Sequence, residues 1–203
     1  DINTRTAWYS KSVRDETNSE DSRGLDEDGS WSGEPLNFPI IQGADCCGEI
    51  ISVGSEVDIS RIGERVLVRT MQQYAVNYRP YEFWTMGSEC DGAFAQFMVA
   101  FSDESYKVES NWSDIDLASI PCAYSTAENL LERSNVIQSE VVLITGASGG
   151  VGSAAIQLAK RRGAKVIAIA SSKKINDVKK IGADIVIKRG DSLSKVLGVE
   201  SVD

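Results

Sequence analysis

The stretch that most constrains the fold is Val141–Gly152, VVLITGASGGVG, where a short apolar run meets four closely spaced glycines. The run Val141–Ile144 is apolar throughout, which is typical of a parallel-sheet strand buried on both faces. A second apolar segment, Lys165–Ala170, follows at the spacing of a βαβ unit. Between the two, apolar residues recur at helical spacing: Val151, Ala154, Ala155, Leu158 and Ala159. The sequence therefore predicts a parallel α/β unit whose first strand enters its helix through a glycine-rich loop.

A glycine-rich loop in this position predicts a phosphate site. Glycines let the backbone turn tightly and leave no Cβ between the backbone and a ligand. The N-terminus of a helix offers unpaired N–H groups and a partial positive charge, which suit a diphosphate. A P-loop would need a lysine after the last glycine, but Ser153 follows Gly152. A glycine-rich turn without a ligand is the plainer alternative, and the succession of strand, glycines, helix and strand argues against it.

The residues after the second strand bear on which nucleotide would bind. NAD-binding proteins usually carry an acidic residue there, which holds the ribose hydroxyls. This chain has Ser171-Ser172-Lys173-Lys174 instead. Two hydroxyls and two ammonium groups suit a ribose 2′-phosphate, so the pattern favours NADP over NAD. The alternative is that the lysines are a solvated helix start, although cations in a first helical turn are mildly unfavourable without an anion nearby.

The composition limits the partners and the chemistry. The 203 residues carry a formal net charge of −9, which argues against nucleic acid and anionic membranes as partners. Histidine is absent, and with it the commonest general base and zinc ligand. The four cysteines match neither a CxxC zinc site nor a disulfide framework, and no apolar run is long enough to span a membrane. A cytoplasmic protein with reduced thiols and a small-molecule substrate is expected.

Short β-branched runs precede the α/β unit. Glu49–Val53, Arg65–Val68 and Gly92–Ala100 are predicted as strands of a compact β-rich domain. Ser113–Ser134 has helical character, with Pro121 interrupting the pattern. After the second strand of the α/β unit the pattern predicts a helix at Lys173–Ile181, a strand at Ala183–Ile187 and a helix at Asp191–Leu197.

Six segments share their spacing with the motifs of one family. In chain order they are GADCCGEIISVGSEV from Gly43, IGERV from Ile62, GAFA from Gly92, STA from Ser125, the loop Gly146–Gly152, and GADIVI from Gly182. They resemble the G-x-E/D-x-x-G-x-V-x-x-V-G, G-D-R-V, G-x-F-A, T-A, A-S-G-G-V-G and G-A-D-x-V-I motifs of the medium-chain dehydrogenase/reductase superfamily. The zinc-free quinone-oxidoreductase-like branch of this alcohol dehydrogenase-like superfamily is the most similar, and the resemblance runs in order from residue 1 to residue 203.

The resemblance implies an α/β protein in which a GroES-like β-barrel catalytic domain, residues 1–122, precedes a Rossmann domain, residues 123–203. The second domain would be the first half, βαβαβ, of a doubly wound parallel sheet, with NADPH in the cleft between the domains. Carried over by position, Thr126 would lie near the nicotinamide. Ser148, Gly149, Gly150 and Val151 would line the diphosphate, and Ser171, Ser172 and Lys174 would hold the 2′-phosphate.

The departures from the family pattern concern zinc and length. Zinc-dependent members have a His directly after the glycine that matches Gly43, and this chain has Ala44. Where many members carry a proton-relay His, it has Asn3. Cys122 aligns with a zinc-ligand position, but one thiolate without the His is a poor site, so no metal is expected. The family continues with further strands and usually a dimer-forming edge, so the chain is expected to be a truncated part of a homodimeric parent.

The leading hypothesis for that parent is zinc-independent hydride transfer from NADPH to a quinone, an enone or alkenal, or a carbonyl, with no catalytic residue assigned. One alternative is a non-catalytic NADPH-binding or scaffold protein of the same fold. Another is a relative of the zinc-dependent alcohol dehydrogenases. A short-chain dehydrogenase would also carry the pattern T-G-x-x-x-G-x-G seen from Thr145, but that class starts near this motif and needs a Tyr-x-x-x-Lys pair that the chain lacks.

Overall fold

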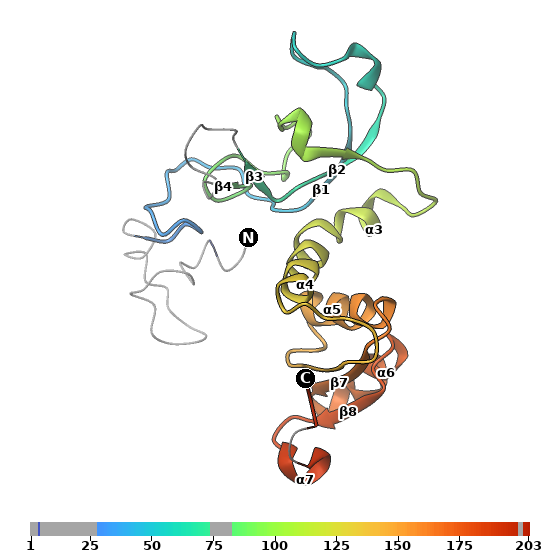
Figure 1. Cartoon of the computed structure of the whole chain (residues 1–203). Helices are drawn as coiled ribbons and strands as arrows, with labels where there is room; N and C mark the ends of the chain where they lie inside the picture. The colour runs from blue at the N-terminus through green and yellow to red at the C-terminus, as the bar shows by residue number, and fades with distance from the viewer. Residues whose placement is uncertain (1–3, 5–27, 74–82, 199–200) are drawn as a thin grey trace. The chain divides into compact units, whose positions relative to one another are not determined.

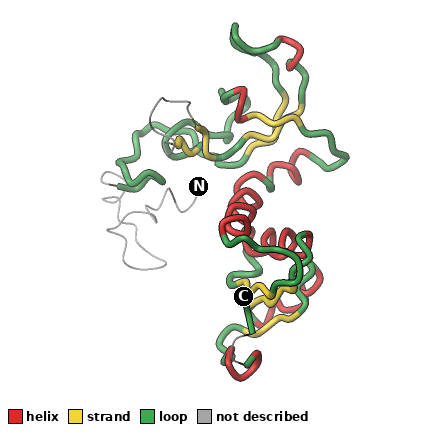
Figure 2. The backbone as a smooth tube through the Cα atoms, viewed as in Figure 1, coloured by secondary structure: helices red, strands yellow, loops and turns green. Residues whose placement is uncertain are grey.

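The computed structural model describes residues 4, 28–73, 83–198 and 201–203 (Figure 1). The chain divides into two compact units, Asp1–Pro121 and Cys122–Asp203. The first unit is built from antiparallel strand pairs and the second from a parallel sheet with helices. Figure 2 shows the strands in yellow and the helices in red. The predicted order of a β-rich part followed by a parallel α/β part is therefore confirmed.

The first unit holds two small antiparallel sheets. One has the strand order β1-β2-β5, with Cys46 opposite Val68 and Val68 opposite Ser105, and the other pairs β3 with β4. Val66 and Val68 are buried with Met86 in the core of this unit. The elements are β1 (Cys46–Glu49), η1 (Ile59–Arg61), β2 (Arg65–Val68), β3 (Met71–Gln73), β4 (Phe83–Thr85), η2 (Ser102–Glu104), β5 (Ser105–Lys107) and α3 (Asp114–Ala118).

Two of the predicted strands in this unit need correction. The strand predicted at Glu49–Val53 lies earlier, because the β1–β2 pairing ends at Ile50, whose N–H donates to the Glu64 carbonyl. The prediction of a strand at Gly92–Ala100 is wrong. Its apolar alternation does not bury one face, since Phe94 and Val99 are 70% and 96% exposed.

The segment that starts at Gly92 instead binds another loop of the same unit. The N–H groups of Gly92, Ala93 and Phe94 donate to the carbonyls of Ile41, Gly43 and Gln42 at 2.7, 2.9 and 2.8 Å respectively. These bonds use the backbone groups that a strand would have offered to a sheet. Two segments that resemble family motifs, one from each side of β2, are thereby held together.

The second unit is a three-stranded parallel sheet with the order β6-β7-β8. Helix α5 packs on β6 and β7, and α6 packs on β7 and β8. The second strand is confirmed at its predicted bounds, whereas the helix predicted from Lys173 starts as a 3-10 turn. The elements are α4 (Pro121–Arg133), β6 (Val141–Ile144), α5 (Gly150–Arg161), β7 (Lys165–Ala170), η3 (Ser172–Lys174), α6 (Ile175–Lys180), β8 (Ile185–Lys188) and α7 (Leu193–Leu197).

The core of the second unit brings α4, α5 and α6 against the sheet. Ile156 of α5 and Val166 of β7 are fully buried, and Val178 of α6 nearly so. Small residues at Ala154, Ala155 and Ala159 let α5 approach the strands closely. Because the strands are parallel, the segments that follow β6, β7 and β8 all emerge at one edge of the sheet. The glycine loop and the Ser171–Lys174 segment are therefore neighbours by topology.

Candidate nucleotide-binding site

The glycine loop turns at its first glycine and packs against itself at its last. Gly146 has a φ of +58°, a left-handed conformation that side chains disfavour. The Gly149 N–H closes the turn by donating to the Gly146 carbonyl at 2.9 Å. A Cβ on Gly152 would lie 2.8 Å from the Ala147 Cα, and nearer still to the Gly146 carbonyl oxygen. Gly152 is therefore needed for the close packing of loop on helix.

The two middle glycines, Gly149 and Gly150, leave the start of α5 exposed and without a side-chain cap. Gly149 precedes the helix in extended conformation and supplies no side-chain cap. A Cβ on Gly149 would meet only the Gly146 carbonyl, at 3.4 Å, and Gly149 and Gly150 are both exposed. The first N–H groups of a helix have no partner within it, so this end of a twelve-residue helix fits an anionic diphosphate.

The structure places the four predicted diphosphate residues at this helix start. Ser148, Gly149 and Gly150 are exposed, while Val151 is half-buried and packs on the core. Val151 can thus offer its backbone but not its side chain. That these residues contact a diphosphate stays a prediction.

The segment after β7 carries the predicted 2′-phosphate residues and one acid that the sequence reasoning missed. Ser171 is half-buried before η3, and Ser172 and Lys174 are exposed. The Lys174 Nζ lies 3.1 Å from the Asp177 Oδ2. The spacing of three residues between Lys174 and Asp177 was the available signal. An exposed pair of this kind contributes only about 0.3–0.5 kcal/mol, so an incoming phosphate can compete with Asp177 for Lys174.

Thr126 lies on α4, the helix that flanks the glycine loop within this unit. Ala123, one turn earlier, would contact a Cβ on Gly150 at 3.5 Å. The Thr126 Oγ1 donates to the Cys122 carbonyl at 2.7 Å, so its proton is used inside the helix and its oxygen can only accept. Its predicted place near a nicotinamide stays a prediction.

Asp184, the acidic residue directly before β8, has a structural role. It precedes β8, at the edge opposite to the glycine loop. Its Oδ2 accepts the Val166 N–H at 2.7 Å and the Lys160 Nζ at 2.9 Å. Burial alone would raise the pKa of Asp184, but these hydrogen bonds outweigh it and lower the pKa below its ordinary value. Asp184 therefore does not supply the ribose-binding acid that NAD would favour.

The loop after Gly43 in the first unit bears on the prediction that no metal is bound. Ala44 follows Gly43 in the loop that binds the Gly92 segment, and an alanine cannot ligate a metal. Among the residues that the structure describes, no three or more His, Cys, Asp or Glu side chains are grouped so as to hold a metal ion. Within the same residues, no helix is long and apolar enough to cross a membrane. The absence of zinc from the protein stays a prediction.

Comparisons with known families match the two halves of the chain separately. The family described as "Alcohol dehydrogenase GroES-like domain" matches residues 18–110, and the family described as "Zinc-binding dehydrogenase" matches residues 150–199. A curated relative, acryloyl-coenzyme A reductase of Metallosphaera sedula, is 31% identical over 160 residues, covering 75% of this chain and 48% of the relative. The chain thus spans about half the length of the curated relatives it matches.

Solved structures agree in fold and in the order of the two parts. A putative alcohol dehydrogenase from Sinorhizobium meliloti is 43% identical with a TM-score of 0.73, and the match covers 83% of this chain and 46% of that one. A quinone oxidoreductase from Coxiella burnetii is 31% identical with a TM-score of 0.64, covering 79% and 46%. With its GroES-like part followed by the first strands of a Rossmann sheet, the chain belongs to the medium-chain dehydrogenase/reductase superfamily.

Proposed function

We propose that the chain is the part of a zinc-independent, NADPH-dependent oxidoreductase that binds the adenosine half of the cofactor. The observation that carries the proposal is that two segments emerge at the same edge of the sheet. One is the glycine loop that opens α5, and the other is Ser171–Lys174, which carries hydroxyls and ammonium groups where NAD-binding sites carry an acid.

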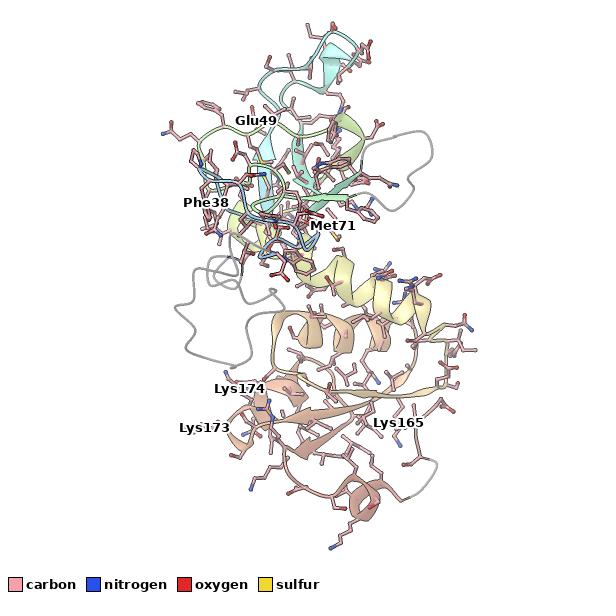
Figure 3. All side chains as sticks on the ribbon, turned by 90° about the vertical axis from the view of Figure 1, so that its left-hand side faces the viewer. Phe38, Glu49, Met71, Lys165, Lys173 and Lys174 are labelled. Atoms are coloured by element: carbon pink, nitrogen blue, oxygen red, sulfur yellow. The ribbon has the colours of Figure 1, made fainter. Side chains whose placement is uncertain are left out.

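The charge distribution supports a polyanionic cofactor. The unit Cys122–Asp203 has more Lys and Arg than Asp and Glu, although the whole chain has 21 basic against 30 acidic residues. Figure 3 shows Lys173 and Lys174 on the same side of this unit. A positive surface around the site would attract NADPH and raise its local concentration.

In this proposal the chain's residues bind and orient the cofactor, which supplies the hydride when bound. The backbone of Ser148–Val151 holds the diphosphate, and Ser171, Ser172 and Lys174 hold the 2′-phosphate. The acceptor is a small molecule: a quinone, an enone or alkenal, or a carbonyl. Relatives named as quinone oxidoreductase, alcohol dehydrogenase and acryloyl-coenzyme A reductase support this range. The parent protein would be a homodimer.

A second candidate is an NADPH-binding protein without catalytic activity. The observation that favours it is that these 203 residues contain no histidine, so this part of the protein supplies no proton donor of the usual kind. Hydride transfer to a quinone or an enone would still be feasible, because water can protonate the product. Binding of NADPH without turnover of any such acceptor by the full-length parent would select this second candidate.

The proposal is tested by thermal unfolding of the chain with NADPH, NADH, 2′,5′-ADP and 5′-AMP. A ligand that binds only the folded state stabilises it by about 2.7 kcal/mol at a hundredfold excess over Kd. Stabilisation by NADPH and 2′,5′-ADP, with much less from NADH and 5′-AMP, is the expected result. A folded sample that responds to none of the four would contradict the proposal.

A further inference from the structure

We infer that Arg189, which follows β8, is a further specificity-determining residue and binds the 2′-phosphate together with Lys174. The inference rests on the proposed function and extends it to a strand that the sequence reasoning did not include in the site. It is carried by the strand register, by the turn that holds Arg189 and by the lack of an ionic partner for Arg189 among the residues that the structure describes.

The register of the sheet places Arg189 next to the Ser171–Lys174 segment. Ala170, the last residue of β7, pairs with Lys188, the last residue of β8. The pairing extends one step further, since the Arg189 N–H donates to the Ala170 carbonyl at 2.8 Å. Neighbouring strands lie about 4.8 Å apart, so the backbones of Ser171 and Arg189 leave the sheet side by side.

A tight turn then keeps Arg189 at this edge. The Asp191 N–H donates to the Lys188 carbonyl at 3.1 Å, which closes a four-residue turn with Arg189 and Gly190 at its centre. Gly190 has a φ of +99°, a conformation that glycine adopts without strain. The chain therefore reverses directly after Arg189, and the residue stays at the corner next to β7.

The charge and shape of its side chain distinguish Arg189 from the lysines of the Ser171–Lys174 segment. The ammonium group of Lys174 is already paired with the Asp177 carboxylate at 3.1 Å, so part of its charge is neutralised. Arg189 is exposed, and it forms no ion pair with any residue that the structure describes, not even with its near neighbour Asp191. A guanidinium group is always charged and its planar fork matches two oxygens of a phosphate, which an ammonium group cannot do. Arg189 is therefore the cation best suited to distinguish a phosphate from a hydroxyl.

The test measures equilibrium binding by calorimetry on the full chain, with 2′,5′-ADP, 3′,5′-ADP and 5′-AMP as probes. Three variants are compared with the unchanged chain: Arg189→Gln, Arg189→Lys and Lys165→Gln. Lys165 is the matched control, because it is an exposed cation of the same unit but stands at the start of β7, and Figure 3 shows it on the opposite side from Lys173 and Lys174. Both Gln variants remove one positive charge, so they change the net charge of the chain equally.

We expect Arg189→Gln to weaken 2′,5′-ADP binding roughly tenfold to a hundredfold, the usual range for a lost hydrogen bond to a charged group. Its binding of 5′-AMP, which lacks the 2′-phosphate, should change by less than about threefold, as should all binding by Lys165→Gln. The affinity of Arg189→Lys for 2′,5′-ADP should lie between those of the unchanged chain and Arg189→Gln, because lysine keeps the positive charge but lacks the planar guanidinium group. The chain should also prefer 2′,5′-ADP over 3′,5′-ADP.

The outcomes separate this inference from the proposed function. An unchanged chain that binds 2′,5′-ADP no more tightly than 5′-AMP would refute the NADPH preference and the role of Arg189 together. A clear preference that survives in Arg189→Gln would overturn the role of Arg189 alone. Equal losses in Arg189→Gln and Lys165→Gln, or equal binding of the two bisphosphates, would show a diffuse positive field and would also overturn it. Circular dichroism of each variant checks that it is folded. If Arg189→Gln does not fold, the 2′,5′-ADP affinity of Arg189→Lys is compared with that of the unchanged chain instead.

Discussion

Replacement of Gly152 by alanine tests whether the glycine loop is held by backbone packing. The new Cβ would lie 2.8 Å from the Ala147 Cα and from the Gly146 carbonyl carbon, and all of these neighbours are backbone atoms that cannot rotate away. Forcing such a contact costs about 1–3 kcal/mol, while the gain in helix propensity is at most about 1 kcal/mol. With the full propensity gain subtracted, Gly152→Ala should destabilise the second unit by about 0–2 kcal/mol, and by about 1 kcal/mol at the middle of that range.

The matched control is Gly150→Ala in the same helix. Its Cβ would meet only the Ala123 Cβ, at 3.5 Å, which is an ordinary contact. This variant should equal or exceed the unchanged chain in stability, because alanine favours the helix.

Circular dichroism at the helical band follows the second unit, which holds α4 and α5. All four Trp residues precede residue 122, so Trp fluorescence reports the first unit and should not change. A loss of about 1 kcal/mol lowers Tm by roughly 4–8 °C in a unit of this size. If Gly152→Ala unfolded at the same temperature as Gly150→Ala, the packing argument would be refuted.

Three further predictions concern the core, the cofactor site and pH. Ile156→Ala, in α5, should cost about 2–5 kcal/mol of unfolding free energy, measured with urea, because the side chain is fully buried. Asp177→Asn should strengthen 2′,5′-ADP binding by about twofold to fivefold in calorimetry, since it releases Lys174 and removes a negative charge; weaker binding would contradict the proposed site. Burial alone would raise the pKa of Glu89, but hydrogen bonds from the Ser32 and Thr85 N–H groups and the Ser88 hydroxyl lower it overall. The stabilisation of the first unit by ionised Glu89 is present above the unfolded-state pKa and is lost as pH falls through the folded-state pKa. In Glu89→Gln, the free energy of unfolding, measured with urea and Trp fluorescence, should therefore fall less as the pH is lowered.

The second unit was largely predictable because its signals are local. The run at Val141–Ile144, the glycines and the helical spacing after Val151 each specify the conformation of their own segment. The structure has β6 and β7 at the predicted residues and starts α5 at Gly150, within one residue of the prediction. The third strand lies at Ile185–Lys188 instead of Ala183–Ile187, because pairing with β7 sets its bounds.

The first unit shows where local patterns fail. The Gly92–Ala100 segment alternates apolar and small residues as a strand does, yet its hydrogen bonds go to the loop at residues 41–43. Alternation indicates a strand only if one face is buried, and burial depends on which partner the tertiary structure provides.

The amino-acid pattern alone predicts that a buried strand enters a helix through glycines and that hydroxyls and ammonium groups follow the second strand. Which charged groups from separate strands meet at that edge depends on how the strands pair in the folded sheet. The Lys174–Asp177 pair follows from a spacing of three residues along the chain, whereas Arg189 lies beside Ser171 because Ala170 and Lys188 are in register. Periodicity is set by neighbours along the chain, whereas a site assembled from separate strands is set by the register of the sheet, which no single segment encodes.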